Sequence, residues 1–162
     1  MTKLTVVTAD LALPAHAEAL ITLLDHYAHD PMGGGDGLSE HVKVNLVQAL
    51  RQRPTAHVVL AFDGAIPAGM IISFEGFSTF SCQPLLNLHD VVVHQDYRGQ
   101  GVFRLLLTQL EVIARQIGCC KLTMEILEGN QAALTAYRAN GFAGYELDPA
   151  MGKAIFWQKK LA

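Results

Sequence analysis

A glycine turn between a strand-like run and a helix-like run constrains this chain more than any other stretch. The run Leu88–Val93 is rich in β-branched residues, and Val102–Ile117 carries apolar residues at helical spacing. Gly99, Gln100 and Gly101 stand between them. Glycine adopts backbone conformations that are closed to other residues and lets a ligand approach closely. The stretch therefore predicts a strand, a tight turn and a helix in immediate succession.

Such a turn is suited to binding an anion. The first N–H groups of a helix have no intrahelical acceptor, and the positive end of the helix dipole lies there. A phosphate or pyrophosphate can be held at this point, and Arg98 and Arg104 could add charge-assisted hydrogen bonds. On the glycines alone, a strand-to-helix turn that binds nothing is an equally good interpretation.

Two common phosphate-binding motifs do not fit the turn. A P-loop needs Lys followed by Ser or Thr after its glycines, and no such pair occurs here. A dinucleotide fingerprint needs a third glycine at the position of Arg104.

The stretch from Arg98 to Phe103 resembles the acetyl-CoA loop of the GCN5-related N-acetyltransferases, the GNAT family, with its pattern Arg/Gln-x-x-Gly-x-Gly/Ala. The match extends through Gly101, and Phe103 replaces the final small residue. A second motif, Asn130 to Tyr137 followed by a Gly-Phe pair, matches the family's Asn-x-x-Ala-x-x-x-Tyr. Two motifs in the right order and spacing are far more specific than either alone. The resemblance covers residues 55–147.

The resemblance implies an α/β fold over a single domain, residues 1–162. Its sheet is expected to be mixed and mostly antiparallel, with six to seven strands, a central parallel strand pair and helices on both faces. It also implies acetyl-CoA as co-substrate, with no metal and no other cofactor. The residues expected to bind acetyl-CoA are Val91, Val92, Val93, Arg98, Gly99, Gln100, Gly101, Val102, Phe103, Arg104, Asn130, Ala133 and Tyr137.

The implied reaction is direct transfer of an acetyl group to a primary amine of a small molecule or peptide. Tyr137 is expected to protonate the coenzyme A thiolate as the intermediate collapses. Glu125 is expected to be the base, because a glutamate with its spacing to the second motif has this role in the family branch that acetylates ribosomal-protein N-termini. A carboxylate half-buried on a strand over Lys121–Leu127 would also have a raised pKa. The other base candidates are Asp90, His89, Glu75 and a water relay.

A second hypothesis comes from a different functional class. The same turn would serve a non-catalytic acyl-CoA-binding sensor or subunit. Mere binding requires neither Tyr137 nor Glu125, so these two residues favour the enzyme.

Composition limits the partners and the compartment. The net charge of -3 argues against a general nucleic-acid binder. No apolar run approaches the ~20 residues of a membrane helix, and the first residues are too polar for a signal peptide. The three cysteines give no disulfide framework, and Cys119 and Cys120 are expected in the core of a cytoplasmic protein. The apolar stretch Phe74–Leu88 could cover the surface of a second copy, so a homodimer is one possible assembly.

Periodicity and capping signals predict the remaining elements. A helix is expected to begin at Pro14 and to end before Pro31, and a second amphipathic helix is expected to begin after Ser39. The expected strands are Leu4–Thr8, Thr55–Phe62, Ala68–Phe74, and an antiparallel pair at Gly144–Leu147 and Ala154–Lys159.

The glycine-rich stretch Pro31–Gly37 is expected to contain no regular element. In the GNAT family this region forms part of the wall of the acceptor site. Two interpretations of this stretch remain: a flexible lid over the amine, or a plain solvent-exposed loop. Histidines at 26, 29 and 41 lie near it, but their spacings match no metal motif.

Overall fold

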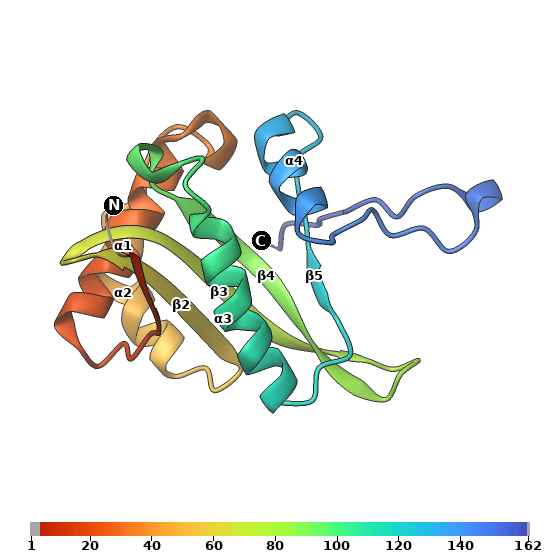
Figure 1. Cartoon of the computed structure of the whole chain (residues 1–162), viewed down its shortest axis with the longest axis horizontal. Helices are drawn as coiled ribbons and strands as arrows, with labels where there is room; N and C mark the ends of the chain where they lie inside the picture. Colours follow the sequence, from red (N-terminus) through yellow and green to blue (C-terminus); the bar gives the residue numbers. More distant parts are fainter. Residues whose placement is uncertain (1–3, 162) are drawn as a thin grey trace. The chain divides into compact units, whose positions relative to one another are not determined.

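The computed structural model describes residues 4–161, and the chain forms two compact units, Met1–Met124 and Glu125–Ala162 (Figure 1). The first unit contains a twisted sheet with helices on both faces. The second contains a short helix and an extended segment.

The sheet has five strands in the order β1-β2-β3-β4-β5. Neighbouring strands are antiparallel except β4 and β5, which are parallel. This arrangement confirms the mixed, mostly antiparallel sheet with a parallel pair, although the described residues form five strands rather than six to seven. The strands are β1 (Leu4–Thr8), β2 (Ala56–Asp63), β3 (Ile66–Ser78), β4 (Gln83–Val93) and β5 (Leu122–Met124).

Only β1 has the predicted boundaries; β2 is shifted by one residue, and β3 runs from Ile66 to Ser78 rather than from Ala68 to Phe74. β4 begins at Gln83 rather than Leu88, because pairing with β3 extends the strand through Pro84 and Asn87, residues of low β propensity. β5 ends at Met124 rather than Leu127, because its pairing with β4 ends there.

Helices α1 (Pro14–His29) and α2 (Glu40–Arg51) cover one face of the sheet. Pro14 occupies the first turn of α1, and the Ser39 hydroxyl accepts a hydrogen bond from the Val42 N–H at 3.3 Å, so both predicted helix starts are confirmed. The core on this face is formed by Ala19, Leu20, Leu23, Leu50, Val58, Leu60, Met70, Ile72 and Val92.

Helix α3 (Val102–Gln116) covers the opposite face of the sheet (Figure 1). Its residues Val102 and Leu106 lie so close to β3 that a Cβ on Gly69 would meet both side chains. Gly69 therefore allows the start of α3 to approach the sheet closely.

Two short 3₁₀ helices flank the region of the glycine turn: η1 (Pro31–Gly33) and η2 (Gln95–Tyr97). The first corrects the prediction that the stretch Pro31–Gly37 contains no regular element. The Asp30 carboxylate caps it by accepting from the Met32 N–H at 2.9 Å, an interaction that stabilises a single turn of helix.

The second unit contains α4 (Gln131–Ala139) and the 3₁₀ helix η3 (Pro149–Met151). The predicted strand pair at Gly144–Leu147 and Ala154–Lys159 is not formed. One isolated antiparallel bridge, Glu146↔Lys153, stands in its place. A two-stranded pair without a sheet face to cover is marginal by itself, and the flanking apolar residues here are exposed.

The cysteines lie outside the core, contrary to the prediction. Cys119 is half-buried and Cys120 is exposed in the connection between α3 and β5, where their N–H groups bond to backbone carbonyls. Within residues 4–161, every helix is too short or too polar to span a bilayer.

Candidate active site

The predicted turn after β4 has a backbone that only glycine adopts readily. Gly99 has φ 75° and Gly101 has φ 79°, both in the left-handed region. A Cβ built on either residue would find no atom within 4 Å. The outer side of the turn is therefore open to a ligand, and a side chain at either position would strain the backbone.

Helix α3 starts directly from this turn. Gly101 is its N-cap, no side chain caps it among the described residues, and the Gly101 carbonyl accepts from the Leu105 N–H at 3.2 Å. Phe103 stands where the family pattern has a small residue, but it is only 8% exposed. Its ring is therefore directed into the core and does not cover the outer side of the turn.

The end of β4 offers backbone groups to the same region. A bulge between Ile72 and Ser73 leaves His89 out of the register with β3, and the last β4–β5 pair is Leu88↔Met124. β4 therefore extends beyond its pairing with β5 as far as Val93.

The direction of these backbone groups follows from one hydrogen bond. The His94 N–H donates to the Ala68 carbonyl of β3 at 2.9 Å. Because backbone groups alternate sides along a strand, those of Val91 and Val93 face away from β3. Val92 has its backbone on the β3 side and its side chain in the core. Of the three valines predicted to bind acetyl-CoA, two have their backbone groups facing away from β3.

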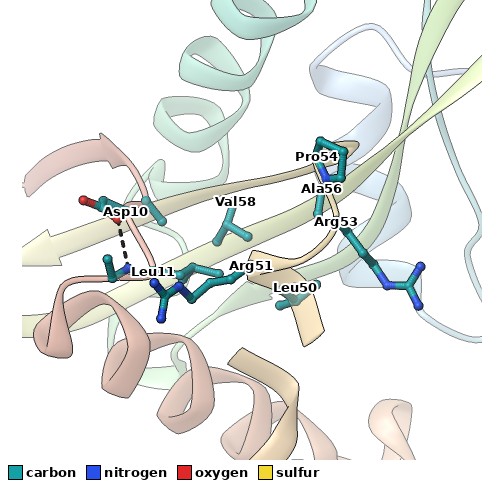
Figure 2. Close-up of a pocket in the computed structure, with 10 residues that line it drawn as sticks. Asp10, Leu11, Leu50, Arg51, Arg53, Pro54, Ala56 and Val58 are labelled. Atoms are coloured by element: carbon teal, nitrogen blue, oxygen red, sulfur yellow. Dashed lines mark hydrogen bonds between the residues drawn. The ribbon is translucent and has the colours of Figure 1, made fainter. Parts of the chain in front are cut away.

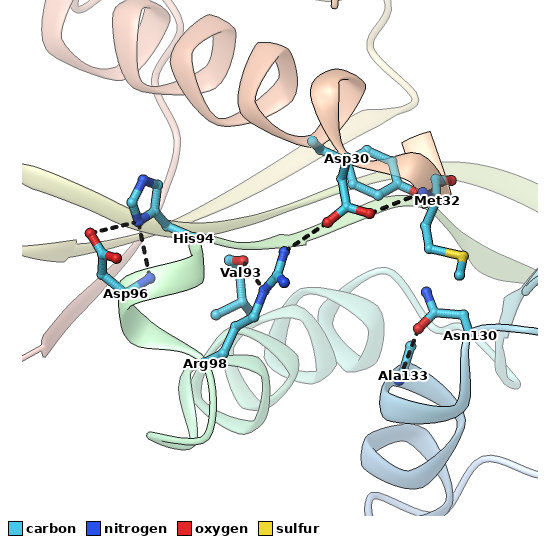
Figure 3. A network of polar contacts seen from close by, with 9 residues as sticks. Asp30, Met32, Val93, His94, Asp96, Arg98, Asn130 and Ala133 are labelled. Carbon is cyan, nitrogen blue, oxygen red and sulfur yellow. Dashed lines mark hydrogen bonds and ion pairs between the residues drawn. The ribbon is translucent and has the colours of Figure 1, made fainter. Parts of the chain in front are cut away.

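Arg98 is held by two partners (Figure 3). Its Nε donates to the Val93 carbonyl at 3.4 Å, and its Nη2 pairs with the Asp30 carboxylate at 3.1 Å. The partnership with Asp30, at the end of α1, was not predicted from the sequence. Its only local signal was an Asp before Pro31, which is typical of a turn.

Asp30 is bound on both carboxylate oxygens. The Met32 N–H and the Arg98 guanidinium both hold the pKa of Asp30 below its ordinary value, and the N–H is the larger cause. Asp30 is therefore an anion that joins the end of α1 to the glycine turn.

A pair of histidines lies beside this ion pair. The rings of His26 on α1 and His94 after β4 are stacked with centroids 4.4 Å apart. Burial lowers the pKa of His26, and the neighbouring His94 and Arg98 lower it further. These effects favour the neutral form of the His26 ring, against the smaller opposing influence of Asp30 and Asp96.

Asp90 is the half-buried carboxylate of β4. It is in register with Ile72, a core residue on the α1 face, so its side chain lies on that face. Burial raises the pKa of Asp90, and the neighbouring His89 offsets part of this effect. Burial also raises the pKa of Tyr27, with a smaller contribution from the charge of Asp90. The pKa of Asp90 is thus shifted in the direction that suits a general base.

The other base candidates have different surroundings. The Glu75 carboxylate accepts a hydrogen bond from the His57 ring, with Nε2 and Oε1 2.6 Å apart. His89 packs edge-on against Phe74 at 5.5 Å. Glu125 lies beyond the end of β5 and is exposed, which corrects its predicted half-burial on the strand.

In the second unit, local hydrogen bonds define both ends of α4. The Asn130 side chain accepts from the Ala133 N–H at 3.2 Å. At the other end Gly141 has φ 88°, and the Phe142 N–H donates to the Tyr137 carbonyl at 3.1 Å. These are the features of a glycine-terminated helix.

Tyr137 is half-buried on α4. Its ring lies 6.1 Å from that of Phe142, so Phe142 folds back on the helix. Asn130, Ala133 and Tyr137 recur at helical spacing and share one face.

A separate hollow of about 310 Å³ lies where the β1–α1 connection meets the end of α2 (Figure 2). Arg51 and Arg53 line its sides, and Leu50 and Val58 belong to the core beneath it. The Asp10 carboxylate on its rim accepts from the Ala12 N–H at 2.9 Å. None of the residues of the two sequence motifs lines this hollow.

The residues present fit acetyl-CoA. The turn leaves its outer side open to a pyrophosphate. The backbone groups of Val91 and Val93 that face away from β3 could form hydrogen bonds with the amide-bearing arm of the coenzyme. Among residues 4–161, no cluster of three or more His, Cys, Asp or Glu side chains could hold a metal ion.

Comparisons with known proteins point to one family. Residues 20–142 match the model of the acetyltransferase (GNAT) family. A thialysine N-epsilon-acetyltransferase of Caenorhabditis elegans is 30% identical over 127 residues, which are 76% of this chain and 75% of that protein. A streptothricin acetyltransferase of Streptomyces lavendulae is 32% identical over 83 residues, 51% of this chain and 44% of that protein.

The fold also matches a solved structure. An aminoglycoside acetyltransferase from an uncultured soil metagenomic sample, in complex with sisomicin, superposes with a TM-score of 0.80 at 16% identity, covering 98% of this chain and 97% of the other. The chain therefore belongs to the GNAT family of acetyltransferases and is an acetyl-CoA-dependent N-acetyltransferase that acts on an amine.

Proposed function

We propose that the acceptor is an aliphatic primary amine on a small cationic molecule. The observation that carries the proposal is Asp90, a half-buried carboxylate on the α1 face, next in the chain to the outward-facing backbone of Val91. A carboxylate at this point attracts a cationic acceptor and can accept its proton. The names of the relatives support the same class, since thialysine and streptothricin acetyltransferases act on amines.

In the proposed reaction, the neutral amine attacks the acetyl carbonyl and coenzyme A leaves as a thiolate. Tyr137 is the proposed acid that protonates this thiolate. The turn Arg98–Arg104 and the backbone groups of Val91 and Val93 that face away from β3 are proposed to hold acetyl-CoA. Asn130 and Ala133, on the same face of α4 as Tyr137, are also proposed to contact it.

Two carboxylates compete for the role of base. Asp90 is favoured by its burial and its raised pKa. Glu125 is favoured by its spacing to the second motif, and its exposure also suits an anchor for a cationic substrate. We propose Asp90 as the base and retain Glu125 as the rival. All described cysteines are free thiols, which supports a cytoplasmic enzyme.

A thiol-release assay with acetyl-CoA tests the proposal. The panel contains lysine and thialysine, a polyamine, an aminoglycoside and a peptide with a free N-terminus. We expect coenzyme A release and an acetylated product, identified by mass spectrometry, with at least one of the small cationic amines. If only the peptide is acetylated, the acceptor class is wrong. Binding of acetyl-CoA without transfer to any amine would instead support a non-catalytic acyl-CoA sensor.

A further inference from the structure

The end of α1 and the glycine turn are joined by one ion pair between residues far apart in the chain. Asp30 and Arg98 are separated by 68 positions, and their side chains meet at 3.1 Å (Figure 3). The Asp30 side chain is 26% exposed and that of Arg98 is 56% exposed. The carboxylate is thus the more buried partner, and the guanidinium reaches toward it from the turn.

Each partner is also bonded to its own segment. Arg98 Nε donates to the Val93 carbonyl, at the end of the outward-facing edge of β4. Asp30 Oδ1 accepts from the Met32 N–H in η1. A guanidinium has five N–H donors, so these two contacts leave donors for a phosphate. The pair can therefore persist when a pyrophosphate binds to the turn.

The segment that follows Asp30 in the chain is the glycine-rich loop 31–37, which is hydrogen-bonded to the end of α1. The Ala28 carbonyl accepts from the N–H groups of Gly35 and Gly37 at 2.9 and 3.2 Å. The Tyr27 hydroxyl donates to the Met32 carbonyl at 3.1 Å. Loop 31–37 is thus bonded to the last turn of α1, and the Asp30 carboxylate contacts the loop through the Met32 N–H.

We propose that Asp30 is a positioning residue that couples acetyl-CoA binding at the glycine turn to the order of loop 31–37. Acetyl-CoA fixes Arg98, Arg98 fixes Asp30, and Asp30 caps η1. By linkage, an ordered loop strengthens acetyl-CoA binding by the same factor. The inference depends on the assignment of the turn to acetyl-CoA, but not on the identity of the amine or of the base.

The test uses Asp30→Asn, since the amide oxygen of Asn can still accept from the Met32 N–H while the charge is removed. The partner variant is Arg98→Gln. Glu111→Gln is the matched control, because it removes an Arg–carboxylate pair at 2.7 Å on α3, away from the turn. Acetyl-CoA affinity is measured by calorimetry, and amide exchange in loop 31–37 is measured with and without acetyl-CoA.

In the wild type we expect acetyl-CoA to slow exchange in loop 31–37. Asp30→Asn should abolish this protection and weaken acetyl-CoA binding by about two- to fivefold, the range of a partly exposed ion pair. The double variant should bind acetyl-CoA no more weakly than Arg98→Gln alone, because both changes remove the same interaction. The control should behave as the wild type.

Additive losses in the double variant, or loop protection that persists in Asp30→Asn, would overturn the coupling. An equal loss in Glu111→Gln would overturn it as well, since the effect would then be one of net charge. Neither readout requires turnover, so an amine panel that shows no transfer leaves this result intact. A wild-type chain whose loop is not protected by acetyl-CoA would contradict the inference directly.

Discussion

Helix α3 and helix α4 each carry one of the two GNAT motifs, but their surroundings differ. α3 follows the glycine turn and buries seven residues, among them Val102, Leu106 and Leu110. α4 buries none of its residues completely and is bounded by the Asn130 cap and the Gly141 stop. The turn before α3 is thus held by the core, whereas α4 is held at its ends by local hydrogen bonds.

The glycine turn and α4 therefore differ in what determines their roles. The glycine turn has left-handed backbone at Gly99 and Gly101 and leads into a helix anchored in the core, so its role in binding can be inferred from its own geometry. The role of Tyr137 on α4 depends on the substrate atom that its hydroxyl meets. Variants in the two regions should therefore affect different kinetic constants.

The largest expected effect is that of Tyr137→Phe on turnover. The variant keeps the ring beside Phe142 and removes the proposed proton donor. We expect kcat to fall by ~10² to 10⁴, the usual value of a positioned acid. Acetyl-CoA affinity should stay within about twofold, because the lost interaction belongs to the transition state.

Tyr145→Phe is the control, since Tyr145 is an exposed tyrosine of the same unit. Wild-type turnover in Tyr137→Phe would assign its hydroxyl a structural role and remove the catalytic difference between the two helices.

The next effect is that of Gly101→Asp on acetyl-CoA binding. A carboxylate would face the phosphates, and the residue would be strained at φ 79°. We expect calorimetry to show about 100-fold weaker binding, or roughly 2.7 kcal/mol.

Gly118→Asp provides a matched control at the other end of α3. Gly118 has φ 75°, and a Cβ there meets nothing within 4 Å. It therefore imposes the same strain without the phosphate site. Equal loss of binding in the two variants would show that strain, rather than position, explains the result.

A third prediction compares a carboxylate from each unit. We expect Asp90→Asn to lower kcat by about 10- to 100-fold near pH 7, with part of the rate regained at higher pH as more free amine is present. Glu125→Gln should raise the KM for the amine and leave kcat intact. The opposite pattern in pH–rate profiles would transfer the role of base to Glu125.

The smallest expected effect concerns stability. The pKa of Asp90 is raised in the folded state, so the folded chain binds more protons than the unfolded chain between the ordinary value of 3.8 and the folded value. Wild-type stability therefore falls as the pH rises through this window. Asp90→Asn should raise Tm at pH 8, and the gain should shrink toward pH 4. Thermal melts that show the same gain at both pH values would contradict the burial of an ionised Asp90.

The sequence by itself determined the features that depend on neighbouring residues. The left-handed glycines of the turn, the Ser39 and Asn130 caps and the Gly141 stop were all predictable, because each satisfies backbone groups within a few positions of itself. The mixed sheet followed from the same local patterns together with the family resemblance.

Only the tertiary structure decided the contacts between distant segments. The bulge opposite Ile72 and the pairing that ends at Met124 determine which backbone groups of β4 face outward. The pair between Asp30 and Arg98 joins residues 68 positions apart, and the burial of Asp90 depends on the elements that pack around it. Local sequence preferences cannot predict such contacts, because burial and pairing are set by the packing of the whole sheet and its helices.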